Sequence, residues 1–245
     1  RLGNLATRGN TPVLALSVAT GVVVAALIAG FEYVAAEVLL HRLQQLPLWQ
    51  MAAAPGIGIL LASLILRYPG RGGTSATSDE FIRAFHDGSP KLPLRDLPAK
   101  LLAGAVTIGM GGALGLEGPS IYTGATVGLT MRDRFGRWLS RDDVKVLLTA
   151  GAAAGVAAVF KAPATGVLFA LEAPYRDDVN RRALLPSLLA AASSYVVYIN
   201  LVGSRAVVPF LNNPANRLGF DQDQLWFTAD DLAGFFTGVE TADVL

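Results

Sequence analysis

Long apolar stretches alternate with short polar segments along most of the chain. The apolar stretches span residues 13–31, 43–66, 101–131, 146–171 and 183–204. Three of them contain no charged residue, whereas Glu117 interrupts the third and Lys161 interrupts the fourth. A helix needs roughly 20 apolar residues to cross the hydrocarbon core of a bilayer, and these stretches are about that long. The pattern therefore predicts an all-α, integral membrane protein that crosses the bilayer several times.

Proline and glycine indicate where the membrane helices are broken. The first helix is expected to continue to about His41, and Pro47 and Pro55 then leave a broken helix or a hairpin as likely as one straight span. Residues 104–128 and 151–166 are dense in glycine, and neither is long enough, uninterrupted, to form an ordinary spanning helix. We therefore expect tilted and broken helices rather than a simple bundle.

Several glycines recur at a spacing of four residues. The pairs are Gly111 and Gly115, Gly124 and Gly128, and Gly151 and Gly155. Small residues at this spacing allow the backbones of two membrane helices to approach closely. Most of these glycines are therefore predicted to serve helix packing.

The longest polar segment within the first two thirds of the chain covers residues 67–100. Ser78 and Glu80 there predict the start of a short helix, because an N-cap hydroxyl followed by acidic residues is typical of a helix N-terminus. Phe81 and Phe85 lie on one face of that helix, which predicts that the face is buried.

Composition supports the membrane interpretation and excludes several functions. Charged residues make up 16% of the 245 positions, against about a quarter in soluble proteins. The net charge of +1 provides no basic surplus for binding nucleic acid. There is no cysteine, and His41 and His86 are the only histidines, so we expect no metal centre and no cofactor. Both histidines are expected at the surface or at an interface.

The most informative local feature is the segment Gly115-Leu116-Glu117-Gly118-Pro119-Ser120. A lone carboxylate at the centre of a spanning helix costs about 2.5 to 3.5 kcal/mol. The flanking glycines permit a sharp turn and Pro119 suits the first turn of a helix, so the segment is predicted to begin a helix at membrane depth. The free N–H groups of such an end form an anion site. Glu117 would occupy that site when charged and leave it when protonated, as a gate does; alternatively, it faces water in a loop between two short helices.

A second motif follows at residues 151–163, with the sequence GAAAGVAAVFKAP, and continues at 166–172 with GVLFALE. Ala162-Pro163 predicts a helix break, and Glu172 is expected to close the segment after it. By itself this motif is compatible with any transporter.

Together, GLEGPS, GAAAGVAAVFKAP and GVLFALE resemble the CLC family of chloride channels and proton-coupled chloride exchangers. The resemblance implies an all-α homodimer in which each subunit has its own pore. Each subunit of that family consists of two inverted halves whose broken helices point their ends at the ion. It also implies that Glu117 is the gating glutamate and that backbone amides around Gly115, Leu116 and Gly118 form the outer anion site.

The chain departs from the family pattern at three positions. The family's G-S-G-I-P segment, whose serine contacts chloride, is replaced by residues 72–79, where Thr74, Ser75 or Thr77 would supply the hydroxyl. The alternative is that these residues only form a loop and an N-cap. Leu116 stands where relatives often carry a basic residue, which would weaken the attraction for anions. Ala173 stands where exchangers carry an inward-facing glutamate, so passive conduction is slightly favoured over proton exchange.

Residues 1–245 are expected to form the first half of a CLC-type transmembrane domain, because the motifs of the second inverted half are not found in them. The expected partners are chloride or another small anion such as fluoride, the lipid bilayer and a second copy of the chain. The expected location is the plasma (cell inner) membrane. The alternatives are a half-transporter that needs a partner and a non-conducting membrane scaffold.

An enzyme of the intramembrane protease class is a further alternative. It would need a nucleophile and a base at membrane depth. Ser120 lies close to Glu117, but no histidine falls within an apolar stretch. We therefore expect a transport protein rather than an enzyme.

Overall fold

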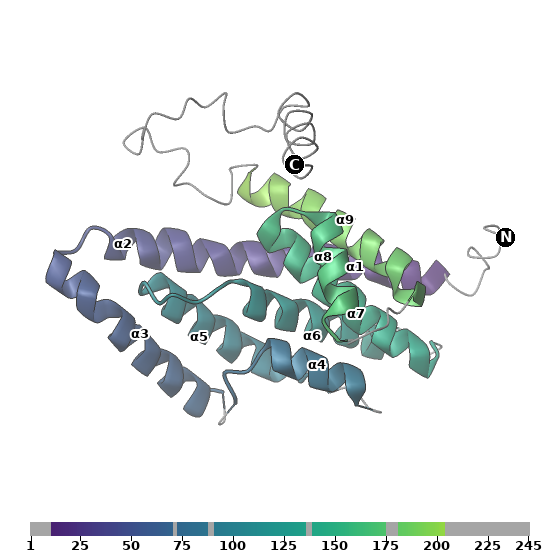
Figure 1. Cartoon of the computed structure of the whole chain (residues 1–245), viewed down its shortest axis with the longest axis horizontal. Coiled ribbons are helices and arrows are strands. Elements are labelled where there is room, and N and C mark those ends of the chain that lie inside the picture. Colours follow the sequence, from purple (N-terminus) through teal and green to yellow (C-terminus); the bar gives the residue numbers. More distant parts are fainter. Residues whose placement is uncertain (1–10, 71–72, 88–90, 136–138, 175–180, 204–245) are drawn as a thin grey trace, which may run out of the picture. The chain divides into compact units, whose positions relative to one another are not determined.

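The computed structural model describes residues 11–70, 73–87, 91–135, 139–174 and 181–203, and within these ranges all regular elements are helices (Figure 1). The α-helices are α1 (Thr11–Glu32), α2 (His41–Leu43), α3 (Leu48–Arg67), α4 (Ser78–His86), α5 (Leu97–Gly109), α6 (Glu117–Phe135), α7 (Arg141–Phe160), α8 (Pro163–Glu172) and α9 (Leu184–Val202). The π-helix η2 (Tyr33–Leu40) and the short 3-10 helices η3 (Leu94–Asp96) and η4 (Arg181–Ala183) complete the set. The predicted all-α class is confirmed.

The first membrane helix is continuous from Thr11 to Leu43, because α1, η2 and α2 follow one another without a break. This confirms the expected extension to about His41. The chain then turns and Pro47 precedes the first residue of α3, so the first proline marks the break between two helices. Pro55 lies inside α3 and does not end it. Membrane helices tolerate such prolines, since neighbouring groups satisfy the freed backbone carbonyl.

Four helical segments of the described chain are long and apolar enough to cross a bilayer. They are Thr11–Leu43, Leu48–Arg67, Asp143–Phe160 and Arg181–Val202. The third segment corrects the expectation that the glycine-rich region around residues 151–166 is too short to span. Helix α7 begins ten residues before Gly151, at Arg141, where the Ser140 hydroxyl and the Asp143 carboxylate form a capping box. The capping box starts the helix in the polar segment that precedes the fourth apolar stretch, so Arg141, Asp143 and Lys145 belong to the first turns of α7.

The predicted break at Ala162-Pro163 is confirmed, and α8 begins at Pro163. Lys161 ends α7 with a left-handed backbone conformation, at φ 53°. This conformation is uncommon for a residue other than glycine, and it reverses the chain direction immediately after α7. Glu172 is the last residue of α8, as expected.

Helices α6 and α7 are in backbone contact through their glycines. A Cβ atom added at Gly124 would overlap the carbonyl oxygen of Gly151, and one added at Gly151 would overlap the carbonyl oxygen of Gly124. Gly128 and Gly155 are equally close to backbone carbonyls of the facing helix. The predicted packing role is thus confirmed for these four glycines. Gly111 and Gly115 lie in the turn between α5 and α6 and do not take part.

The spanning segments differ strongly in how much protein surrounds them. In α7, 83% of the apolar window is buried, against α6, α8, α9 and α1, whereas in α3 the share is 17%. Helix α3 packs on α5 (Figure 1). It leaves Ile59, Leu60 and Leu61 exposed. An exposed face as apolar as this one is suited to lipid or to further apolar protein, and α7 forms the interior of the described fold.

Candidate anion site

The site is built on the N-terminus of α6. Glu117 is the first residue of this helix, and the first backbone bond runs from the Ser120 N–H to the Leu116 carbonyl, at 3.1 Å. The N–H groups of Glu117 and Gly118 have no acceptor within the helix, and Pro119 has no N–H at all. The predicted helix start is therefore confirmed, and it leaves an unpaired, partially positive end.

The Glu117 side chain folds back over the preceding turn. A Cβ atom at Gly115 would overlap the Oε2 atom of Glu117, so only glycine leaves room for the carboxylate there. The Glu117 side chain is half-buried in this position. The gate residue predicted from the sequence thus lies at the N-terminus of α6, with its carboxylate against Gly115.

The N-terminus of α4 lies against the same place. Thr77 precedes α4, and its hydroxyl oxygen would be 2.5 Å from a Cβ atom at Gly118. The Thr77 hydroxyl makes no capping hydrogen bond to α4, although Thr77 is the N-cap residue. The first turns of α4 and α6 therefore meet, and the glycine at 118 is what permits their close approach.

A cavity of about 550 Å³ opens between these two helix ends, α3 and α5. It is lined by Ile59, Ala62, Ser63, Leu66, Ser75, Thr77, Ser78, Lys100, Ala103, Gly104, Thr107, Leu114, Gly115, Glu117, Gly118 and Pro119. Most of the wall is apolar, and the polar groups gather at the helix ends. A concave, mostly apolar site with a few converging polar groups is typical of small-ligand binding.

The cavity brings together four of the six residues predicted to form the site: Ser75, Gly115, Glu117 and Gly118. Thr74 and Leu116 are not in its wall. The Thr74 hydroxyl donates a hydrogen bond to the Glu80 carboxylate, and the Leu116 side chain packs against buried apolar residues. Within the described chain, Ser75 and Thr77 are therefore the better-placed candidates for the hydroxyl that meets an anion.

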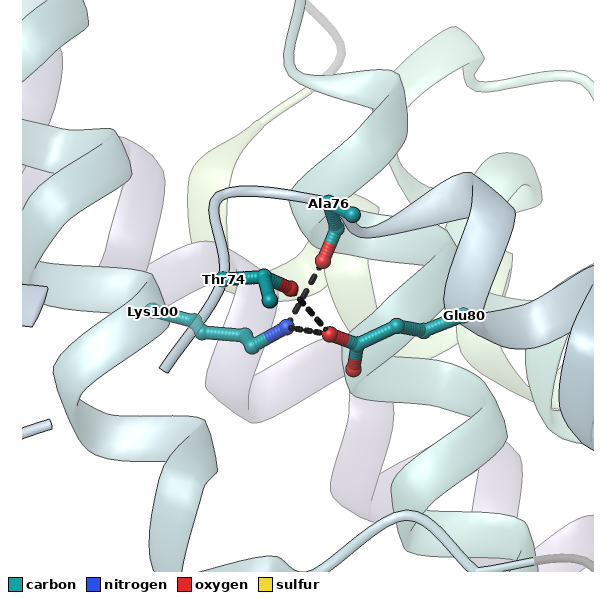
Figure 2. Close-up of polar contacts among 4 residues, drawn as sticks. All are labelled: Thr74, Ala76, Glu80 and Lys100. Atoms are coloured by element: carbon teal, nitrogen blue, oxygen red, sulfur yellow. Dashed lines mark hydrogen bonds and ion pairs between the residues drawn. The ribbon is translucent and has the colours of Figure 1, made fainter. Parts of the chain in front are cut away.

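The structure adds a charged pair that the sequence interpretation missed (Figure 2). Lys100, on α5, is only 7% exposed and forms an ion pair with Glu80 of α4 at 2.8 Å. Its ammonium group also donates a hydrogen bond of 2.6 Å to the Ala76 carbonyl and lies 4.2 Å from the centre of the Tyr122 ring. Lys100 immediately precedes the third apolar stretch, and that position was the only sequence feature that could have singled it out.

The histidines, the acidic residues and Ser120 are the candidates for metal binding and for nucleophilic catalysis. No group of three or more histidine, aspartate or glutamate side chains in the described residues could hold a metal ion. His41 and His86 are exposed, as expected, although His86 also makes a hydrogen bond of 2.7 Å with the Pro174 carbonyl. Ser120 is fully buried and donates its hydroxyl proton to the Leu116 carbonyl, an arrangement that does not activate a nucleophile.

Comparison with known proteins gives a consistent result. The model of the voltage gated chloride channel family matches residues 57–239. The H(+)/Cl(-) exchange transporter ClcA of Cronobacter sakazakii (strain ATCC BAA-894) is 35% identical over 182 residues, which are 69% of this chain and 38% of the transporter.

Two solved structures share the fold. A slow cyanobacterial Cl−/H+ antiporter superimposes with a TM-score of 0.64 at 23% identity, over 94% of this chain and 54% of the antiporter. A CLC-type fluoride/proton antiporter superimposes with a TM-score of 0.62 at 27% identity, over 78% of this chain and 47% of the antiporter.

The chain therefore spans between 38% and 54% of the length of these relatives. The family match covers most of the chain and includes α4, both helix ends of the cavity and Glu117. The resemblance inferred from the three motifs is confirmed, and the chain belongs to the voltage-gated chloride channel (CLC) family of multi-pass membrane proteins.

Proposed function

We propose that the protein containing this chain exchanges chloride, or a similar small anion, for protons across a membrane, with Glu117 as the gate. One observation carries the proposal: the N-termini of α4 and α6 and the Glu117 carboxylate converge on one cavity in a membrane protein. Each helix end offers N–H groups and about half a positive charge to an anion.

The position of Glu117 links the anion to the proton. A charged carboxylate on the first residue of α6 would compete with chloride for the free N–H groups of that helix end. Protonation removes that competition, because a neutral carboxyl group is no longer attracted to the helix end. Occupancy of the site by the anion therefore depends on whether Glu117 carries a proton. This dependence is the minimum requirement for coupled exchange.

The relatives favour exchange over passive conduction. The named transporter and both named structures are described as proton exchangers or antiporters. Passive conduction, which the sequence interpretation slightly favoured, is retained as the second candidate because Ala173 directly follows Glu172. The fluoride antiporter among the neighbours also supports fluoride as an alternative anion.

The complete pathway requires more protein than the described residues. By the family resemblance, we propose a homodimer in the plasma membrane whose subunits each contain a second inverted half. The half-transporter and the inert scaffold are the corresponding alternatives. All transport experiments are therefore designed for the full-length product.

Chloride-loaded liposomes that contain the full-length protein provide the test. We expect chloride efflux down its gradient to drive proton uptake against a proton gradient, followed together with a chloride electrode and external pH. Efflux without proton movement would replace exchange by passive conduction. If neither chloride nor fluoride leaves the liposomes, the transport proposal fails and the scaffold alternative takes its place.

The hydroxyls at the cavity provide a second, local test. Ser75→Ala and Thr77→Val should each weaken chloride binding roughly fivefold to tenfold, because each removes one uncommitted donor from the anion site. Isothermal titration with potassium chloride measures the effect. Ser63→Ala is the matched control, since the Ser63 hydroxyl lines the same cavity but donates to the Ile59 carbonyl. Equal losses in all three variants would contradict the assignment.

A further inference from the structure

Lys100 is the buried cation of the anion cavity. It lines the same wall as Ser75 and Glu117, and its side chain is 5% exposed. A lysine is almost never buried to this degree without a partner, because removing the ammonium group from water is costly. The groups that contact its ammonium nitrogen therefore determine how its charge acts on an anion in the cavity.

Three groups surround the ammonium nitrogen of Lys100. Figure 2 shows two of them, the Glu80 carboxylate at 2.8 Å and the Ala76 carbonyl at 2.6 Å. The third is the face of the Tyr122 ring, whose centre is 4.2 Å away. An ammonium group has three N–H donors, so these contacts use its full capacity. The group is thus fixed in place, and it acts on an anion in the cavity through its charge rather than as a direct ligand.

Glu80 has a double role in the same cluster. Its carboxylate accepts the Lys100 ion pair and also the hydrogen bond from Thr74. Thr74 and Ala76, the two residues next to Ser75, are therefore both held by this pair (Figure 2). At the same time the carboxylate places a negative charge next to Lys100, which opposes the attraction of the lysine for an anion.

We infer that Lys100 and Glu80 form a charge-balanced pair that sets the affinity of the cavity for its anion. Lys100 supplies attraction, and Glu80 limits that attraction while it positions Ser75. A transport site must bind its ion well enough to admit it and weakly enough to release it. The inference rests on the proposed function, because it concerns the affinity of the proposed anion site.

The charge of Glu80 can be removed without removing its hydrogen bonds. In Glu80→Gln the amide oxygen still accepts from Lys100 and Thr74, so the loop around Ser75 keeps its support. The charge of Lys100 is then no longer balanced. We expect chloride binding to tighten on the order of tenfold, and chloride turnover to slow, since one opposing charge near the site is lost.

Lys100→Met produces the opposite change. It keeps an apolar stem of similar length but leaves the Glu80 carboxylate without its ion-pair partner, behind the cavity wall that Lys100 lines. We expect chloride binding to weaken by more than about tenfold. The double variant Lys100→Met with Glu80→Gln removes both charges, and its affinity should return to within a few-fold of the wild type.

Isothermal titration of the detergent-solubilised full-length protein with potassium chloride, repeated with potassium fluoride, measures these affinities. Liposome efflux measures turnover. Asp79→Asn is the matched control: it removes one acid from the same turn of α4, but Asp79 is exposed and forms no ion pair with Lys100. Its affinity should equal that of the wild type.

Three results would overturn the inference. Weaker chloride binding in Glu80→Gln would show that the pair serves only to hold the loop around Ser75. The titration of Glu80→Gln tests the inference even if Lys100→Met does not fold. A shift in Asp79→Asn equal to that in Glu80→Gln would assign the effect to overall charge. Wild-type protein that neither binds nor transports chloride or fluoride would remove the proposed function together with this inference, whereas failure of the variants alone leaves the proposed function standing.

Discussion

Replacement of Glu117 by glutamine is expected to reduce proton transport to the level of empty liposomes while chloride still binds. Glutamine has the size of a protonated glutamate but cannot take up or release a proton. Under the proposed mechanism it also removes a negative charge that competes for the N–H groups at the start of α6. Chloride affinity should therefore rise roughly tenfold, as expected for the loss of one like charge at close range in a partly solvated site.

The same variant should lose the pH dependence of chloride efflux. Under the proposed mechanism the wild-type carboxylate leaves the site when it takes up a proton, so efflux should change with pH; in Glu117→Gln the rate should be flat. Glu37→Gln is the control, because Glu37 is an exposed acid on η2 and does not line the cavity. Proton transport that persists in Glu117→Gln would contradict the gate assignment, whatever the chloride rate.

The sequence predicted those parts of the site that depend on the backbone preferences of a few neighbouring residues. Glycine and proline around Glu117 fix the start of α6, because only a few backbone conformations suit these residues. Ala162-Pro163 fixes the break before α8 for the same reason, and Ser78 with the acids after it predicts α4. These three features depend on neighbours in the chain, so one sequence was enough to place them.

The parts that the sequence did not predict depend on tertiary contacts. Lys100 and Glu80 lie on different helices, and nothing local indicates that they pair. Likewise, Thr74 and Ser75 are both small hydroxyl residues in one loop, and only the position of Glu80 shows that Thr74 is already hydrogen-bonded. The expectation that residues 151–166 are too short to span was wrong because α7 begins earlier, with charged first turns that follow the capping box at Ser140.

A single methyl group at the contact between α6 and α7 is expected to destabilise the protein strongly. In Gly151→Ala the new Cβ atom overlaps the carbonyl oxygen of Gly124, which belongs to a helix backbone and cannot rotate away. The helices must separate along a buried interface, at a cost of about 3 kcal/mol, the upper end for overpacked cores. For a domain of this size we expect the unfolding temperature in detergent to fall by roughly 6–12 °C.

Gly30→Ala separates this steric effect from the general effect of changing a helical glycine. Gly30 lies within α1, and a Cβ atom there meets nothing within 4 Å. Because alanine is the better helix former, Gly30→Ala should leave the unfolding temperature unchanged or raise it, with a gain of about 0.5–1 kcal/mol.

Gly124→Ala should behave like Gly151→Ala, since the contact is reciprocal. Once the first methyl group has moved the helices apart, the second meets less resistance, so the double variant should lose clearly less than the sum of the two single losses. Equal behaviour of Gly151→Ala and Gly30→Ala would show that α6 and α7 are not in backbone contact, and the alignment of the α6 helix end with the anion cavity would then need another explanation.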